Sequence, residues 1–174
     1  MGDAWRNTKV YDSLPFTLDI SQGPYTYVYS HMGNYDTGDP TTSWRGDASE
    51  YFPLDARGND PSWASHNFAF CTELHTTFQY QSGLKFEFTG DDDIWVFVND
   101  SLSIDLGGVH IAKSSFLDLD DLVNLRFGNT YDFDFFQCER HENHSSSRIV
   151  TNIKMALPKG NPVASWRRDY GALD

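Results

Sequence analysis

The chain has 174 residues, of which 39% are hydrophobic and 16% aromatic, and its formal net charge is −12. This length suits one domain with a real core, and the high aromatic content argues against disorder and favours β-structure. The acidic balance argues against nucleic acid as a partner, because phosphate binding needs a basic patch.

The chain carries no segment that predicts membrane insertion. No apolar run approaches the 18 residues of a spanning helix. The first ten residues, MGDAWRNTKV, also lack the apolar core of a signal peptide. We therefore expect either a cytosolic protein or a part of a longer, processed chain.

The first half of the chain predicts strands and loops. Residues 25–30 (YTYVYS) are strand-like, and the stretch that follows is rich in turn residues. From residues 67–80 (NFAFCTELHTTFQY) onward, the chain indicates strands separated by turns. Residues 84–90 (LKFEFTG) alternate, which predicts a half-buried strand with Leu84, Phe86 and Phe88 on its inner face.

Residues 94–98 (IWVFV) are apolar on both faces, as expected of a central strand in a two-layer structure. Asn99 and Asp100 tolerate a positive φ, so they predict a tight turn into a second hairpin strand, with Leu102, Ile104 and Leu106 in phase.

The second half continues the pattern. Residues 116–125 predict either a short helix or a loop, capped by Asp118 or Asp120. Residues 130–141 alternate, with Tyr131, Phe133 and Phe135 facing inward, and residues 145–157 predict the last strand. We find no repeat and no second domain, so the sequence predicts a single all-β domain, a sandwich or barrel.

The two cysteines, Cys71 and Cys138, are too few and too far apart for a zinc site made of cysteine alone. Each lies in a strand-like stretch, so they could face each other across neighbouring strands. Two readings follow: a disulfide, which implies an oxidising compartment, or two buried free thiols.

The sequence offers little for catalysis. Residues 141–144 (HENH) do not form the H-E-x-x-H zinc motif, because the histidines are three residues apart. We find no nucleophile elbow, P-loop or dinucleotide-binding glycine pattern. A glycosidase needs two carboxyl groups flanking a bond, and abundant Asp is not evidence for such a pair. We predict that the chain is not an enzyme.

The densest acidic cluster lies at residues 91–93 (DDD), directly before the apolar run, in a chain that has 20 Asp and only 5 Glu. It is not an EF-hand loop, because Trp95 and Val96 occupy the fifth and sixth positions counted from Asp91. Two alternatives remain from the residues alone. The three carboxylates are either solvated turn residues or part of a calcium site assembled from separate loops.

Five segments stand out together in this order: FPLDARG (52–58), HNFAFCTELHTTFQY (66–80), FTGDDDIWVFVNDSLSIDLGGVH (88–110), GNTYDFDFF (128–136) and ERH (139–141). They resemble the fibro-slime domain, a branch of the PA14 superfamily. The resemblance covers about residues 52–155. On this basis we expect a PA14-like antiparallel β-sandwich or barrel over residues 1–157 and a tail or linker over 158–174.

The resemblance implies a function and a site. PA14 lectins are extracellular and bind sugars through a calcium ion, which is held by two consecutive Asp joined by a cis peptide bond. Asp91 and Asp92 align with that pair and Asp93 with the spacer after it, although Asp92 and Asp93 are an alternative pair. A second loop, ERHENHSSS, would add Asn143 or Glu142 as metal ligands.

Neighbouring residues are candidates for ligand binding. We include Asp93, His110, Arg140, His141 and His144. For Arg140 the alternative is a structural ion pair with an Asp such as Asp105, and for the histidines it is packing. We expect a calcium-dependent carbohydrate-binding module of a secreted or cell-surface protein, serving adhesion or recognition. The alternative is an extracellular signalling or adhesion module that binds a protein or peptide, such as a cell-surface protein, through the same surface.

Overall fold

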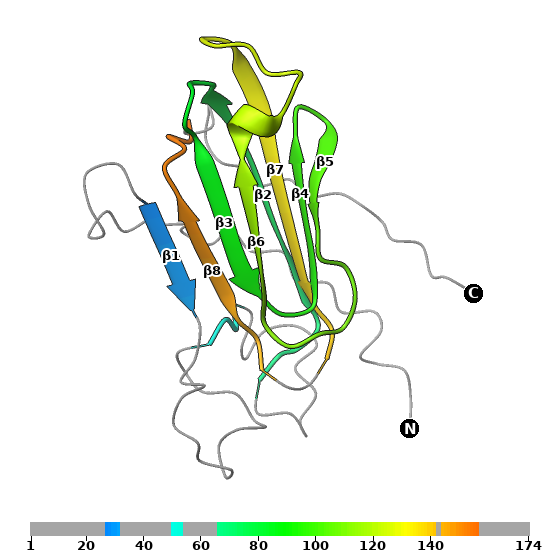
Figure 1. Ribbon diagram of the computed structural model, residues 1–174. Coiled ribbons are helices and arrows are strands. Elements are labelled where there is room, and N and C mark those ends of the chain that lie inside the picture. The colour runs from blue at the N-terminus through cyan, green and yellow to red at the C-terminus, as the bar shows by residue number, and fades with distance from the viewer. Residues whose placement is uncertain (1–26, 32–49, 54–65, 142–143, 157–174) are drawn as a thin grey trace.

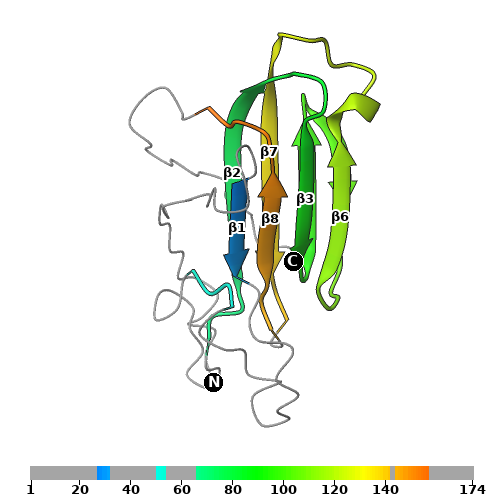
Figure 2. The same ribbon diagram turned by 60° about the vertical axis from the view of Figure 1, so that its left-hand side comes forward.

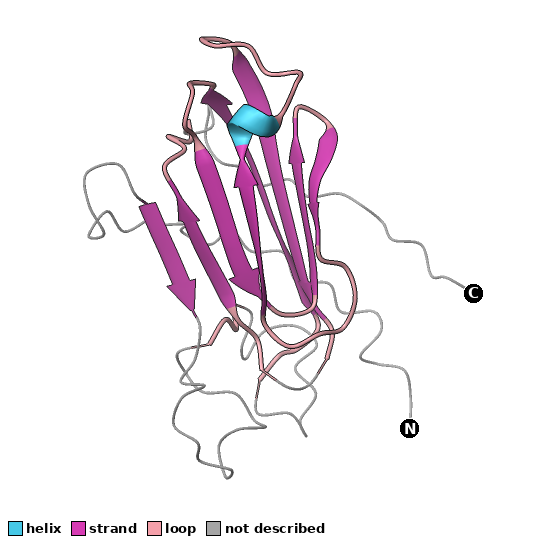
Figure 3. Ribbon diagram, viewed as in Figure 1, coloured by secondary structure: helices cyan, strands magenta, loops and turns pink. Residues whose placement is uncertain are grey.

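The computed structural model describes residues 27–31, 50–53, 66–141 and 144–156 (Figure 1). Apart from one short 3₁₀ helix, the regular structure of these residues is entirely β (Figure 3). The strands are β1 (Tyr27–His31), β2 (Phe70–Gln79), β3 (Lys85–Gly90), β4 (Asp93–Val98), β5 (Ser101–Asp105), β6 (Lys113–Asp118), β7 (Thr130–Glu139) and β8 (Ser147–Thr151).

The strands form two four-stranded antiparallel sheets. One has the order β1-β8-β3-β6 and the other β2-β7-β4-β5. Figure 2 shows the strands of the first sheet side by side in front of the second. The prediction of a single all-β sandwich is confirmed for the residues described. The expected boundary between a domain at 1–157 and a tail at 158–174 lies outside them and stays a prediction.

The alternating strands supply the core between the sheets. Phe86 and Phe88 of β3 are completely buried, and their rings lie 5.0 Å and 5.2 Å from those of Phe133 and Phe135 of β7. The side chains between them, such as Glu87, point away from the core. These two strands therefore match the alternation read from the sequence.

Strand β4 has the central position that its sequence predicts, but its two faces are not equally buried. Ile94, Val96 and Val98 face the core and are at most 2% exposed, but Trp95 and Phe97 on the other face are only partly buried. The strand is central within its sheet, between β7 and β5, but nothing among the described residues covers its outer face completely. The apolar run thus reflects a central position in the sheet rather than burial on both faces.

The turns and short elements between the strands mostly lie where the sequence predicts them. Asn99 and Asp100 have φ of 50° and 61° and join β4 to β5 in the expected hairpin. Residues 116–125 begin as the end of β6 and continue as a 3₁₀ helix, η3 (Leu119–Asp121), capped by the Asp118 side chain. From residue 67 onward the chain begins with one ten-residue strand, β2, and continues as strands separated by turns, as predicted. The last strand is shorter than predicted, because it ends at Thr151.

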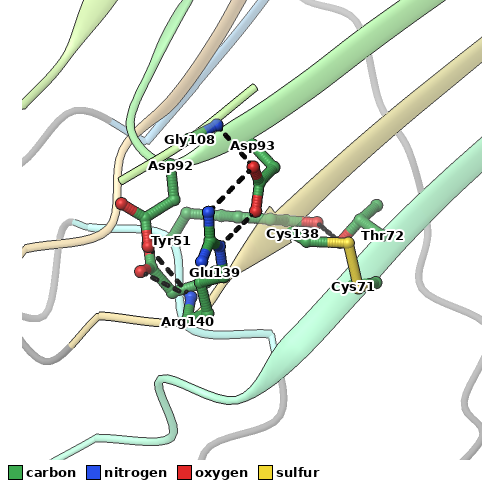
Figure 4. The surroundings of a disulfide bond; sticks show 9 residues. All are labelled: Tyr51, Cys71, Thr72, Asp92, Asp93, Gly108, Cys138, Glu139 and Arg140. Atoms are coloured by element: carbon green, nitrogen blue, oxygen red, sulfur yellow. Dashed lines mark hydrogen bonds and ion pairs between the residues drawn. A yellow bond between two sulfur atoms is a disulfide. The ribbon is translucent and has the colours of Figure 1, made fainter. Parts of the chain in front are cut away.

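Cys71 and Cys138 form a disulfide, with their Cα atoms 4.1 Å apart (Figure 4). They are directly opposite each other in the register of β2 and β7. The pairing of these strands therefore brings the two sulfurs together, and the alternative of two free thiols is wrong. None of the helices described is long and apolar enough to cross a membrane.

Candidate functional site

The three consecutive aspartates lie at one end of the sandwich, where β3 passes into β4. Asp91, Asp92 and Asp93 are only 3%, 2% and 7% exposed. The alternative that they are solvated turn residues is therefore wrong. A buried carboxylate needs hydrogen bonds or a counter-charge, so their partners define the chemistry of this end of the molecule.

Asp91 and Asp92 accept hydrogen bonds from the backbone of three different segments. Asp91 accepts one from the Ser146 backbone N–H, on the segment that leads into β8. Asp92 accepts from the N–H of Arg140, at 3.0 Å, and from that of His110, at 3.4 Å. The two carboxylates thus tie together the ends of β7 and β8 and the loop between β5 and β6.

The peptide bonds of the described residues are all trans, so the cis bond implied for the Asp pair is not present. The chain turns at Asp92 through a positive φ of 55° instead. Such a φ is uncommon for a non-glycine residue but is tolerated by Asp. With this turn, the carboxylates of Asp91 and Asp92 both lie against backbone N–H groups and accept hydrogen bonds from them.

Asp93 has a different partner from the other two. It binds the Arg140 guanidinium through Nε at 2.5 Å and Nη2 at 3.3 Å, and accepts from the Gly108 N–H at 2.5 Å (Figure 4). Burial acts to raise the pKa of Asp93, but the hydrogen bonds from Arg140 and Gly108 outweigh it and lower the pKa below its usual value. The expected partner of Arg140, Asp105, instead accepts from the Gly107 N–H.

Glu139, the last residue of β7, is a member of the cluster that the sequence prediction missed. It is 2% exposed, and its Oε1 accepts from the N–H groups of Arg140 and His141. Its Oε2 is buried and receives no hydrogen bond from the described residues. The alternation of β7 could have identified it, because Glu139 lies on the same inward-facing side of the strand as Phe133 and Phe135.

The surroundings of Glu139 make its carboxyl group hard to ionise. Burial is the main cause that raises its pKa, and hydrogen bonding to Asp92 is the second. The negative charges of Asp92 and Asp91 raise the pKa further. The N–H of His141 opposes them, and together these effects raise the pKa of Glu139 to about 9. At neutral pH Glu139 is therefore protonated and can donate to Asp92. Asp91, Asp92 and Glu139, called the acid cluster below, concentrate negative charge in a buried place.

A pocket of about 250 Å³ opens beside the acid cluster. Five predicted site residues line it, together with two aliphatic residues: Asp91, Asp92, His110, His141, His144, Val109 and Ile111. Asp93 and Arg140 are not among the lining residues, because they are paired with each other. The two other predicted metal ligands, Glu142 and Asn143, lie outside the described residues.

The histidines of the pocket are held by specific contacts. His144 Nδ1 lies 2.9 Å from the carboxylate of Glu50, which also accepts from the Ser145 N–H. The His110 ring lies between two backbone carbonyls, with Nε2 2.8 Å from Leu106 O and Nδ1 2.9 Å from Ile111 O. These rings therefore help to fix the loops that border the pocket.

The chemistry of the acid cluster fits a hard cation. Carboxylate oxygens are the ligands that Ca²⁺ prefers, and the buried Oε2 of Glu139 lacks a donor. The described residues contain no group of three or more His, Cys, Asp or Glu side chains already arranged as metal ligands. A cation held here would need further oxygens, from backbone carbonyls or from the side chains predicted at Glu142 and Asn143.

The fold and the cluster define a disulfide-linked β-sandwich with a buried acidic site at one end. The chain is similar to proteins of Dictyostelium discoideum. It is 43% identical to Protein psiD over 124 residues, which is 67% of this chain and 24% of psiD. It is 39% identical to Protein psiQ over 151 residues, or 84% of this chain and 15% of psiQ, and 34% identical to Protein psiG over 161 residues, or 86% and 20%.

The chain thus corresponds to a quarter or less of the length of these three relatives. No protein-family model matches it, and no solved structure matches it either.

Proposed function

We propose that the chain is a calcium-dependent carbohydrate-binding module of a secreted or cell-surface protein, acting in adhesion or recognition. The proposal rests on the resemblance to the fibro-slime and PA14 domains. The observation that carries it is the burial of Asp91 and Asp92, at 3% and 2% exposure, against a third carboxyl group at the edge of a pocket. Without a cation, such a cluster stays buried only by keeping a proton on Glu139.

The roles of the residues follow from their contacts. Asp91 and Asp92 would hold the calcium ion, and Glu139 would contribute charge once its proton is displaced. Asp93 and Arg140 would keep the end of β7 in place, because their ion pair joins it to the start of β4. Calcium bound at this site would supply coordination positions for two neighbouring sugar hydroxyls.

The disulfide supports an extracellular location, since such bonds persist in oxidising compartments. We propose a binding rather than a catalytic role on the sequence argument alone, because the chain carries none of the catalytic motifs considered above. Binding would be weak for a single site, since one ion and a few hydroxyls bury little area.

An alternative proposal is a module that binds a protein or peptide through the same surface. One observation favours it: Val109 and Ile111 at the pocket are 51% and 84% exposed, and exposed aliphatic side chains are common in protein interfaces. The two proposals differ in their ligand, so a glycan array with and without EDTA separates them.

The test compares wild type with Asp92→Asn, with Asp100→Asn as the matched control. Asp100 is exposed in the turn at the opposite end of β4. We expect wild type and Asp100→Asn to bind calcium by calorimetry and to be retained on glycans only when calcium is present. Asp92→Asn should lose both, while keeping its fold in EDTA, because it removes a buried charge next to that of Asp91 and keeps a side-chain oxygen that can accept a backbone hydrogen bond.

Unchanged calcium binding in Asp92→Asn would refute the site. Glycan binding that is indifferent to EDTA would refute the calcium dependence. Calcium binding without retention on any glycan, combined with binding to a protein or peptide, would favour the alternative.

A further inference from the structure

Two aliphatic side chains stand at the edge of the pocket with much of their surface in water. Val109 is 51% exposed and Ile111 is 84% exposed. Both lie in the loop between β5 and β6, on either side of His110, and both line the pocket that borders Asp91 and Asp92. They contribute little to the core in this position, so their exposure calls for another explanation.

The loop that carries them is tied to the acidic end of the molecule at several points. The Leu106 N–H donates to Ile94 O at 2.9 Å, and the Gly108 N–H donates to Asp93 at 2.5 Å. The His110 ring lies between the carbonyls of Leu106 and Ile111. Because these contacts flank Val109 and Ile111, the two side chains are presented at a defined place beside the carboxylates.

The lining of the pocket therefore combines carboxylates, histidines and aliphatic side chains. Asp91 and Asp92 offer carboxylate oxygens, and Val109 and Ile111 offer an aliphatic surface. At about 250 Å³ it is smaller than the roughly 300–1,000 Å³ of pockets that enclose drug-sized ligands. Its size suits a single sugar ring that has hydroxyls on one side and an apolar group on the other.

We propose that Val109 and Ile111 contact a methyl group of the bound sugar, so that the site prefers methyl-bearing sugars, of which the 6-deoxyhexoses are the simplest. This inference rests on the proposed carbohydrate-binding function and specifies its ligand class. A sugar with a hydroxymethyl group in the same place would put a hydroxyl against aliphatic carbon, which makes a poorer apolar contact than a methyl group does.

The expected preference is measurable. Burying one methyl-sized group is worth about a fourfold change in affinity. We therefore expect the 6-deoxy sugar to bind about fourfold more tightly than its hydroxylated counterpart.

The test uses pairs of methyl glycosides that differ only at C6: 6-deoxy-D-galactose against D-galactose, and D-rhamnose against D-mannose. Each is measured by competition against glycan-coated beads in calcium. The variant is Val109→Thr with Ile111→Thr, which keeps β-branched side chains but adds hydroxyls. The control is Val123→Thr, because Val123 is 94% exposed and follows η3, next to the start of β3 and away from the pocket. Calcium binding without sugar is measured for all three proteins.

We expect the 6-deoxy preference in wild type and in Val123→Thr, and its loss in the double variant with calcium binding unchanged. Equal affinity for both members of each pair in wild type would overturn the inference and leave the proposed function standing, as would a preference that survives in the double variant. Failure of every sugar to compete in calcium would overturn the proposed function and this inference with it. A peptide ligand retained through Val109 and Ile111 would overturn the inference in favour of protein recognition.

Discussion

Glu139 should make the stability of the protein depend on pH in a specific direction. Its pKa in the folded protein is raised from 4.5 to about 9. The folded state therefore binds this proton more tightly than the unfolded chain. The stabilisation is fully present below about pH 4.5 and is lost as pH rises towards 9.

The size of the effect follows from the width of that window. Each pH unit between the two pKa values lowers the free energy of unfolding by about 1.4 kcal/mol, so the loss between pH 5 and pH 8 is about 4 kcal/mol. Glu139→Gln should remove this dependence. Glutamine is neutral at every pH, its Oε1 can accept from Arg140 and His141, and its amide can donate to Asp92 as a protonated carboxyl would.

The assay is urea unfolding in EDTA at pH 5, 6, 7 and 8 for wild type, Glu139→Gln and Glu87→Gln. Glu87 is the control because its side chain is 42% exposed and pairs with Arg148 on the outer face of β3. Wild type and Glu139→Gln should have similar stability at pH 5 and diverge by about 4 kcal/mol at pH 8, with Glu139→Gln the more stable. If the free energies of unfolding of wild type and Glu139→Gln change in parallel from pH 5 to pH 8, burial does not raise the pKa of Glu139 as argued. If a cation replaces the proton, added calcium should also reduce the divergence.

Two further predictions concern the frame around the site. Replacing Cys71 and Cys138 by alanine opens a cross-link between residues 67 apart, so the free energy of unfolding should fall by about 4 kcal/mol in urea titrations; equal stability of the variant and wild type would contradict this. Gly90→Ala places a Cβ 2.5 Å from the Phe88 ring and from a backbone carbonyl, so overpacking should cost about 1–3 kcal/mol. An unchanged urea midpoint would contradict this, because it would mean that a methyl group fits at residue 90 without displacing its neighbours.

The sequence predicted the features of the fold that depend on residues close together in the chain. The alternation around Phe86 and Phe133 identified which faces meet in the core, and Asn99 with Asp100 identified a hairpin, because side-chain phase and turn chemistry depend on near neighbours. The central position of β4 was predicted, but the partial exposure of Trp95 on its outer face was not, because that depends on what covers the sheet. No run of residues in β4 itself contains that information.

The site shows a similar division. The resemblance to the PA14 lectins implied that Asp91 and Asp92 belong together, with Asp92 and Asp93 as the alternative pair. In the structure Asp93 instead forms an ion pair with Arg140. The sequence did not indicate that all three are buried, since burial here comes from loops distant in the chain. Glu139 was missed because a charged residue at the end of a strand is usually exposed to water, even where the alternation of the strand points it inward. Only the tertiary arrangement shows that this strand end is enclosed.

The disulfide and the acid cluster are neighbours, and this explains how the cluster tolerates its own repulsion. Cys138 lies opposite Cys71 in β2 and opposite Asp93 in β4, and the next residue along β7 is Glu139. The cross-link therefore anchors the part of the sheet in which the carboxyl groups crowd together. If it is broken, mutual repulsion can be relieved by separating the end of β7 from its neighbours. We therefore expect reduction to loosen the acidic end before the core, so that an oxidising environment both stabilises the sandwich and keeps Asp92 and Glu139 close enough to share a proton or a cation.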